Sequence, residues 1–86
     1  MSIPEFQEFM LPVLRFLADK KEHSSQELYR LAADYFNLSE EDRRESLPSG
    51  TEPRYVNRTS WARTFLGKAG LIEMPRRGYA KITKEA

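Results

Sequence analysis

The chain has 86 residues, of which 40% are hydrophobic and 31% are charged, a composition typical of one ordinary globular domain. It contains no cysteine, which excludes a disulfide scaffold and a thiolate metal site. No apolar stretch approaches the roughly 20 residues that span a bilayer, and the N-terminus lacks the basic-then-apolar pattern of a signal peptide. We therefore expect a single domain over residues 1–86, located in the cytoplasm and without a membrane partner.

The net charge of +1 conceals a division between the two parts of the chain. Residues 1–53 carry 6 Lys or Arg against 11 Asp or Glu, a balance of −5, whereas residues 54–86 carry 8 against 2, a balance of +6. Such asymmetry is typical of a protein with one face directed at a polyanion. A solvated surface whose charges segregate without a function explains the charge alone equally well.

Apolar residues recur at three- and four-residue spacing between Ile3 and Ala18, which predicts an amphipathic helix with one core-facing stripe. The stripe consists of Phe6, Phe9, Met10, Val13, Leu14 and Leu17. Pro12 lies inside this pattern, where it removes a backbone donor and crowds the preceding turn. We therefore expect a kink there, or a short helix followed by a second one that starts near Leu11.

The polar connector over residues 19–24 predicts a loop with one or two extended residues, in which His23 is an exposed histidine rather than a ligand. Ser24 or Ser25 then caps a second helix, because Ser24 and Glu27 have the spacing of a capping box. This helix is expected to stop at Asn37. Its expected buried residues are Leu28, Leu31, Ala32, Tyr35 and Phe36.

Two short features separate this helix from the last one. Ser39, with Asp42 three positions later, predicts a charged helical turn that ends at Arg44 or Glu45, and its acidic first turn complements the helix dipole. Residues 47–53 predict a loop, because they contain two prolines and a glycine.

The last predicted helix spans Arg54–Ala69 and is followed by Gly70 as a C-terminal cap. Projected at about 100° per residue, it has one largely apolar face and one polar face. The apolar face carries Tyr55, Thr59, Ala62, Phe65, Leu66 and Ala69. The polar face and its borders carry Asn57, Ser60, Arg63, Thr64, Gly67 and Lys68. Trp61 lies at a flank, where we expect it to close the edge of the core.

Two short strands follow, over residues 71–74 and 79–83, and they enclose the basic tip Pro75-Arg76-Arg77-Gly78. This hairpin, over about residues 71–83, has the position of a wing. Helix, helix, short turn, helix and hairpin is the order of a winged helix-turn-helix. We therefore expect a mainly α fold with a small antiparallel hairpin.

The polar face of the last helix suits base reading, because this helix enters the major groove of double-stranded DNA in helix-turn-helix proteins. Asn57 can pair with adenine and Arg63 with guanine. Ser60 or Thr64 can meet either kind of partner or a thymine methyl group. Lys68, near the helix end, is better placed to contact the phosphate backbone.

The basic hairpin supplies the remaining expected contacts. Arg76 and Arg77 suit phosphates or a narrow minor groove, and Lys81 and Lys84 extend the same surface. Arg58 projects toward the apolar face, which favours a structural role and a pairing with an acid from the first half of the chain. The predicted DNA-binding residues are therefore Asn57, Ser60, Arg63, Thr64, Lys68, Arg76, Arg77 and Lys81.

No catalytic constellation is recognisable in the sequence. A metal site needs several ligands at suitable spacing, a nucleophile needs a neighbouring base, and neither pattern is present. Asp19-Lys20-Lys21 matches the short Asp-x-Lys element of many nucleases, but it lies at a helix end without a clear upstream acid, so we interpret it as chance. We expect no enzymatic activity, no cofactor and no metal in this chain.

Taken together, these residues resemble the N-terminal domain of the Mrr family of restriction proteins. The matching segments are, in order, Ile3-Pro4, Leu11-Pro12-Val13-Leu14, Leu47-Pro48-Ser49-Gly50, Arg58 followed by Trp61-Ala62, Leu66, Lys68-Ala69-Gly70-Leu71 and Pro75-Arg76-Arg77-Gly78. No single segment is specific. Their order and spacing across almost the whole chain carry the resemblance.

The resemblance implies a winged-helix module that delivers a nuclease to double-stranded DNA, and the family is associated with modified, especially methylated, DNA. It also implies a separate C-terminal nuclease domain of the PD-(D/E)xK class, outside these 86 residues. Trp61, Tyr55 and Tyr79 are the aromatic residues to examine for contact with a modified base. The alternative is a protein–protein interaction or dimerisation module without DNA binding, with the aromatic N-terminal helix as its contact surface. The sequence leaves open whether the protein forms a homo-oligomer.

Overall fold

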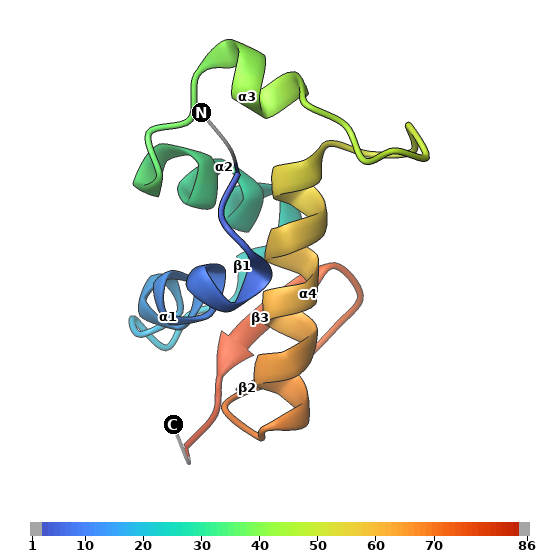
Figure 1. The fold of residues 1–86 in the computed structure, drawn as a ribbon. Helices are drawn as coiled ribbons and strands as arrows, with labels where there is room; N and C mark the ends of the chain where they lie inside the picture. Colours follow the sequence, from blue (N-terminus) through green and yellow to red (C-terminus); the bar gives the residue numbers. More distant parts are fainter. Residues whose placement is uncertain (1–2, 85–86) are drawn as a thin grey trace.

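The computed structural model of the chain describes residues 3–84 and combines helices with a small antiparallel sheet (Figure 1). Within those residues the helices are α1 (Phe6–Phe16), α2 (Ser25–Tyr35), α3 (Glu40–Arg44) and α4 (Arg54–Lys68). The strands are β1 (His23–Ser24), β2 (Ile72–Glu73) and β3 (Tyr79–Ile82), arranged in the order β1-β3-β2. A mainly α fold of the winged-helix type is therefore confirmed.

Helix α1 is one continuous element through Pro12, so the expected second helix starting near Leu11 is wrong, while a bend at Pro12 stays a prediction. Pro12 is itself buried beside Phe9 and Val13, and the apolar contacts of its ring offset the backbone hydrogen bond that it cannot donate. The helix begins later than predicted, because Glu5 has an extended backbone (φ −69°, ψ 160°) and forms the N-cap.

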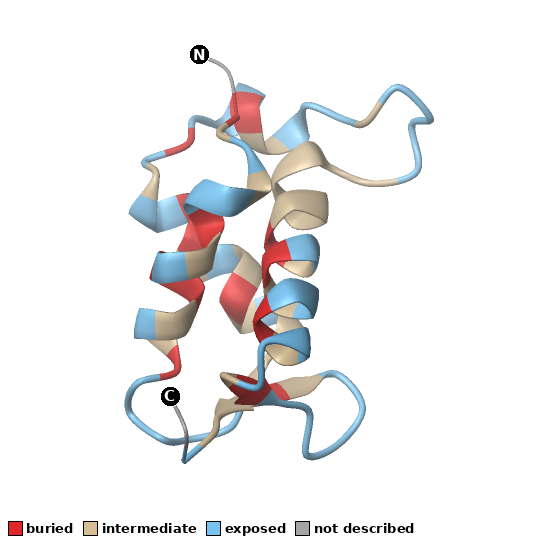
Figure 2. Cartoon of the chain, turned by 60° about the horizontal axis from the view of Figure 1, so that its bottom comes forward, coloured by how far each residue is buried: buried red, intermediate tan, exposed pale blue. Residues whose placement is uncertain are grey.

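The core lies where α1, α2 and α4 face one another, and the sheet closes one end of it. Figure 2 shows the buried residues on the inward sides of the helices and the exposed ones along the longer loops. The fully buried side chains of the core include Phe9, Val13, Leu17, Leu28, Ala32, Ala33, Ala62 and Ala80. Phe9 packs against Phe36 with ring centroids 4.6 Å apart.

The expectation that Tyr35 is buried is wrong, because Ala33 occupies the inward position instead. Tyr35 belongs to the last turn of α2 and is exposed. Its ring packs edge-on against Phe16 and Phe36 at the surface, an arrangement that buries ring area and leaves the hydroxyl in water.

The predicted starts of α2 and α3 and the predicted stop at Asn37 are confirmed by the local geometry. Ser24 Oγ accepts the Glu27 backbone N–H at 3.1 Å, which makes Ser24 the N-cap of α2. Ser39 and Asp42 form a reciprocal capping box at the start of α3, with N···O distances of 3.0 and 3.2 Å. Asn37 follows the end of α2 with a positive φ of 53°, a conformation that asparagine tolerates better than most residues.

The sheet joins the hairpin to the connector after α1. Strand β1 pairs with β3 in the register His23↔Ala80 and Ser24↔Tyr79, which confirms two extended residues in the connector. Strand β2 pairs with β3, with Glu73 opposite Lys81, and both strands are shorter than the predicted ranges 71–74 and 79–83. Because side chains alternate along a strand, the buried Ala80 faces the helices while Tyr79 and Lys81 project from the other face.

Candidate nucleic-acid interface

Helix α4 has a well-defined inward face. Thr59, Ala62 and Leu66 are buried, and the Thr59 hydroxyl is satisfied because it donates to the Tyr55 carbonyl at 2.9 Å. The helical repeat then places Thr64 and Lys68 on the opposite, outward side, and both are exposed. Two predicted members of the polar face therefore lie where a ligand can reach them.

Phe6, Phe65 and Trp61 form an aromatic ladder that runs from α1 to this outward side of α4. The exposure of residues on this side shows that three predictions are wrong. Phe6 stacks on Phe65 with centroids 4.9 Å apart, and Trp61 follows at 6.1 Å from Phe65. Trp61 is 48% exposed and so does not close the edge of the core, while Phe65 and Ala69, expected to be buried, are also exposed. Phe6 is the side chain of α1 that reaches Phe65, and the partly exposed Trp61 ring lies beyond Phe65.

Two of the predicted base readers are engaged with other parts of the protein. Asn57 Nδ2 donates to Glu52 Oε2 at 3.1 Å, and the Ser60 hydroxyl lies 3.3 Å from the Tyr29 hydroxyl of α2. Both side chains are half-buried. Either residue must exchange its present partner before it can contact a base, so their role as readers stays a prediction.

Arg63 lies at the flank of α4 that faces α2, rather than on the outward face. Its Nη1 donates to Ser25 Oγ at the start of α2. Ser25 in turn donates twice to the Gly78 carbonyl of the hairpin, from its backbone N–H at 2.9 Å and from its hydroxyl at 3.3 Å. Arg63, the start of α2 and the hairpin are thereby joined in one hydrogen-bonded unit.

The two hairpin arginines differ in their surroundings. Arg76 Nε donates to Glu22 Oε1 at 2.9 Å, and its guanidinium lies 3.8 Å from the Tyr79 ring centroid, a cation–π contact. Arg77 is exposed and forms no hydrogen bond or ion pair with any residue in the range 3–84. Arg76 is therefore held in place, whereas Arg77 is available to a ligand.

A groove of 320 Å³ separates α4 from the hairpin. It is lined by Arg63, Thr64, Met74, Arg76, Arg77, Gly78 and Tyr79. No acidic side chain lines it, so its positive charge is not cancelled from within. The structure thus brings four predicted DNA-binding residues together around one hollow.

Two other predicted contacts lie outside this groove. Lys68 is exposed near the end of α4, with its Nζ 5.8 Å from the Phe65 ring centroid. Lys81 lines a separate hollow near the end of α1, together with Lys20 and Lys84. Lys68 and Lys81 are therefore placed for contacts with the DNA phosphate backbone outside the groove, and not for contacts within it.

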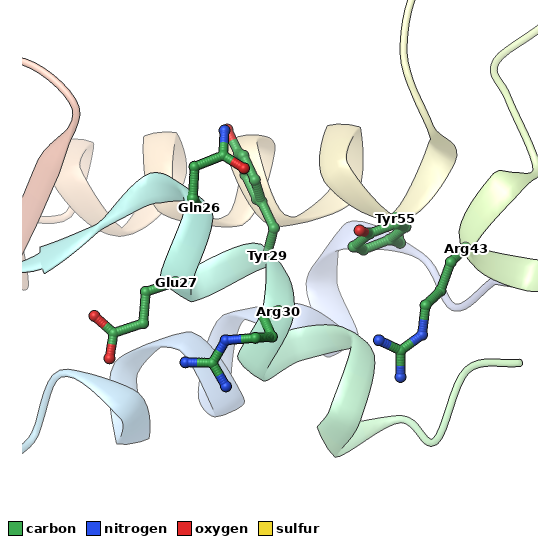
Figure 3. A pocket seen from close by; sticks show the side chains of 6 residues that line it. All are labelled: Gln26, Glu27, Tyr29, Arg30, Arg43 and Tyr55. Carbon is green, nitrogen blue, oxygen red and sulfur yellow. The ribbon is translucent and has the colours of Figure 1, made fainter. Parts of the chain in front are cut away.

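The sequence analysis did not identify the outer surface of α2 as a candidate site. A hollow of 600 Å³ on this surface is lined by Gln26, Glu27, Tyr29, Arg30, Arg43 and Tyr55, from α2, α3 and α4. Figure 3 shows the side chains that line it. Tyr29 connects this hollow to α4 through its contact with Ser60. In helix-turn-helix proteins the helix before the recognition helix crosses the DNA backbone. Applied to α2, the long helix that precedes the short α3 and then α4, this rule would have pointed to Tyr29 and Arg30.

Arg58 has the structural role that was predicted for it. Its side chain is 19% exposed, and its Nη2 lies 4.0 Å from Glu5 Oε2, an acid from the first half of the chain. Its Nη1 also donates to Asn57 Oδ1 at 3.2 Å. Arg58 therefore contributes to the contact between α4 and the residue that caps α1.

The comparisons with known proteins agree with this architecture. A family model described as the Mrr N-terminal domain matches residues 6–86. The chain belongs to the Mrr N-terminal domain family. It is 37% identical over 79 residues to the type IV methyl-directed restriction enzyme EcoKMrr of Escherichia coli K12, an alignment that covers 91% of this chain and 26% of that enzyme. The chain thus spans about a quarter of the length of this curated relative. No solved structure matches it significantly.

Histidine 23 of this Mrr-family domain is not the exposed loop residue that was expected. It lies in β1 with a side chain only 11% exposed, its Nε2 2.9 Å from both Asp19 carboxylate oxygens and its Nδ1 3.1 Å from Glu27 Oε2. Burial alone lowers the pKa of His23, but the two carboxylates outweigh it and raise the pKa above its ordinary value. The hydrogen bond from His23 in turn lowers the pKa of Asp19.

This histidine cluster does not form a metal site, because the two carboxylates face opposite nitrogens of the ring rather than one common point. Across residues 3–84, no group of three or more histidine, aspartate or glutamate side chains is arranged to hold a metal ion. None of the helices in that range combines the length and the hydropathy needed to cross a bilayer.

Proposed function

We propose that this chain is the DNA-targeting module of a restriction system in the cytoplasm, with α4 in the major groove of a duplex and the hairpin on the adjacent backbone. The observation that carries the proposal is the groove between α4 and the hairpin, which three arginines line and no acid does. Membership of the Mrr family supports it, as does the similarity to an enzyme named as a methyl-directed restriction enzyme. Cleavage would then belong to a C-terminal nuclease domain outside this chain.

The outward face of α4 supplies the proposed base contacts. Thr64 is exposed there, and Asn57 and Ser60 join it once they exchange their present partners. Trp61 adds an exposed apolar ring to the same side, a surface suited to the methyl group of thymine or of a methylated base. Methylated DNA is for this reason the proposed target.

Fluorescence anisotropy with labelled duplexes of identical sequence, one unmodified and one methylated, tests the proposal. With about four to six phosphate contacts, log Kobs should fall against log salt with a slope of roughly −3.6 to −5.4. Absence of salt-sensitive binding at micromolar protein concentration would contradict a DNA-binding function. Equal affinity for the two duplexes would contradict only the preference for methylated DNA.

A second candidate function is a contact surface for another protein or another copy, and the exposed aromatic ladder favours it. Trp61, Phe65 and Leu11 are large apolar side chains with exposed surface. Sedimentation equilibrium distinguishes this candidate from a DNA-binding monomer. If the protein is a monomer at the highest attainable concentration, self-association is contradicted. A dimer that dissociates on the substitution Trp61→Ala supports it.

A further inference from the structure

The groove between α4 and the hairpin is built as an anion site, and Arg63 is its most constrained member. The Arg63 side chain lines the groove while its Nη1 is bonded to Ser25 Oγ. Its Nε is buried and has no hydrogen-bond partner among residues 3–84. The protein therefore fixes this guanidinium through Nη1, while the buried Nε stays unpaired and out of reach of a ligand. Nη2, which has no hydrogen-bond partner among these residues and is not buried, is the nitrogen left for an anion.

The hairpin side of the groove supplies a second positive charge. Arg77 lines it from the hairpin and has no partner within residues 3–84, whereas Arg76 is already paired with Glu22 and stacked on Tyr79. The Thr64 hydroxyl donates to the Ser60 carbonyl at 3.0 Å and so offers no free proton to an anion. Arg63, from α4, and Arg77, from the hairpin, are thus the two lining arginines without an acidic partner among residues 3–84.

We propose that this groove binds one phosphodiester of the DNA backbone between Arg63 and Arg77. The proposal rests on the proposed function, and it replaces the expectation from the sequence that Arg63 reads guanine with a role as a phosphate ligand. Planar guanidinium groups pair with phosphate oxygens through two parallel hydrogen bonds, a match that other anions and neutral ligands satisfy less well.

The same chemistry would also suit free phosphate or a phosphate monoester. DNA is the preferred source, because the groove borders α4 and the hairpin, the two elements that meet adjacent parts of a duplex in winged-helix proteins. A phosphate held there would set the position of α4 in the major groove without carrying sequence information.

The test compares the wild-type chain with Arg63→Ala, Arg77→Ala, the double variant and the control Arg44→Ala. Arg44 is an exposed arginine of α3, at the opposite end of the molecule from the hairpin (Figure 1). Binding to two duplexes of unrelated sequence is titrated by anisotropy between about 50 and 200 mM salt. Far-UV circular dichroism checks that each variant is folded.

For both duplexes we expect Arg63→Ala and Arg77→Ala each to weaken binding by about five- to tenfold. The salt slope should fall by about 0.9 in the double variant, the contribution of one phosphate, and by less than that in each single variant. The double variant should lose less than the product of the two, because both residues contact one phosphate. Arg44→Ala should change affinity by less than about twofold. Arg77 has no partner to lose, so its variant tests the site even where Arg63→Ala disturbs the packing.

Other outcomes overturn the proposal in distinguishable ways. A loss on Arg63→Ala that is confined to one duplex, with an unchanged salt slope, makes Arg63 a base reader. If the loss of affinity in the double variant equals the product of the two single losses, Arg63 and Arg77 contact two separate phosphates. If inorganic phosphate shifts the backbone amide NMR signals of Thr64 and Gly78 while duplex binding ignores both substitutions, the ligand is free phosphate. A wild-type chain that binds no duplex contradicts the proposed function itself.

Discussion

The ion pair between Glu22 and Arg76 places a negative charge next to the surface proposed for DNA, and replacing it should strengthen binding. Glu22 Oε1 lies 2.9 Å from Arg76 Nε, and both side chains are substantially exposed. In water, a carboxylate about 7 Å from a phosphate is repelled by roughly 0.6 kcal/mol. An exposed ion pair adds about 0.2–1 kcal/mol that Arg76 must give up before it turns toward DNA. Together these contributions, about 0.8–1.6 kcal/mol, predict that Glu22→Gln binds about four- to fifteenfold more tightly at low salt.

The assay is an anisotropy titration at about 50 mM salt, repeated at about 150 mM, where screening should reduce the gain. Glu40→Gln is the matched control, because Glu40 also pairs with an arginine, Arg44, at 3.5 Å but lies in α3 far from the hairpin. An equal effect of the two substitutions would refute the argument, since net charge alone would explain it. Weaker binding by Glu22→Gln would also refute it and would mean that Glu22 orients Arg76 for its contact.

Three further predictions concern stability. Phe9→Ala removes a fully buried ring and should destabilise the domain by about 3–5 kcal/mol, seen as a thermal midpoint lower by at least about 12 °C; a shift of a few degrees would contradict the assigned core. Ser24→Ala should cost about 1 kcal/mol in urea unfolding through loss of the α2 cap, and an unchanged midpoint would show that the cap adds nothing. In the folded protein the pKa of His23 is raised above 6.5, because the carboxylates of Asp19 and Glu27 outweigh burial. Protonated His23 therefore stabilises the fold at low pH, and this stabilisation is lost as pH rises through the folded pKa. His23→Gln should therefore cost more stability at about pH 5 than at about pH 8, and a cost independent of pH would contradict this assignment.

Features that depend on neighbours in the chain were predictable from the sequence. The caps at Ser24 and Ser39 and the stop at Asn37 involve partners within three or four residues, so their spacing alone identifies them. The tendency of Arg58 toward a structural role also followed from its projection on the helix. The order of these elements was enough to predict a winged helix.

Features that depend on distant segments were not predictable in this way. His23 is buried because β1 pairs with β3, more than 50 residues later, and a polar connector gives no sign of that pairing. Trp61 is exposed because no element packs over its side of α4, which a helical projection does not reveal. Arg63 was assigned to the polar face, yet its contact with Ser25 places it between α2 and the hairpin. In each of these cases tertiary packing decides the outcome.

The two hydrogen bonds from Ser25 to the Gly78 carbonyl fix the tip of the hairpin, where it meets β3, to the start of α2, and Arg63 ties α4 to the same point. The hairpin therefore cannot swing toward or away from α4 without breaking these bonds. In the proposed complex, a duplex that receives α4 in its major groove would have to present the neighbouring backbone at the spacing that the protein has already set. The domain would then discriminate between duplexes by groove width and favour those that adopt this width at low deformation energy. Little conformational entropy would be lost on such binding, because the two contacting elements are already held together.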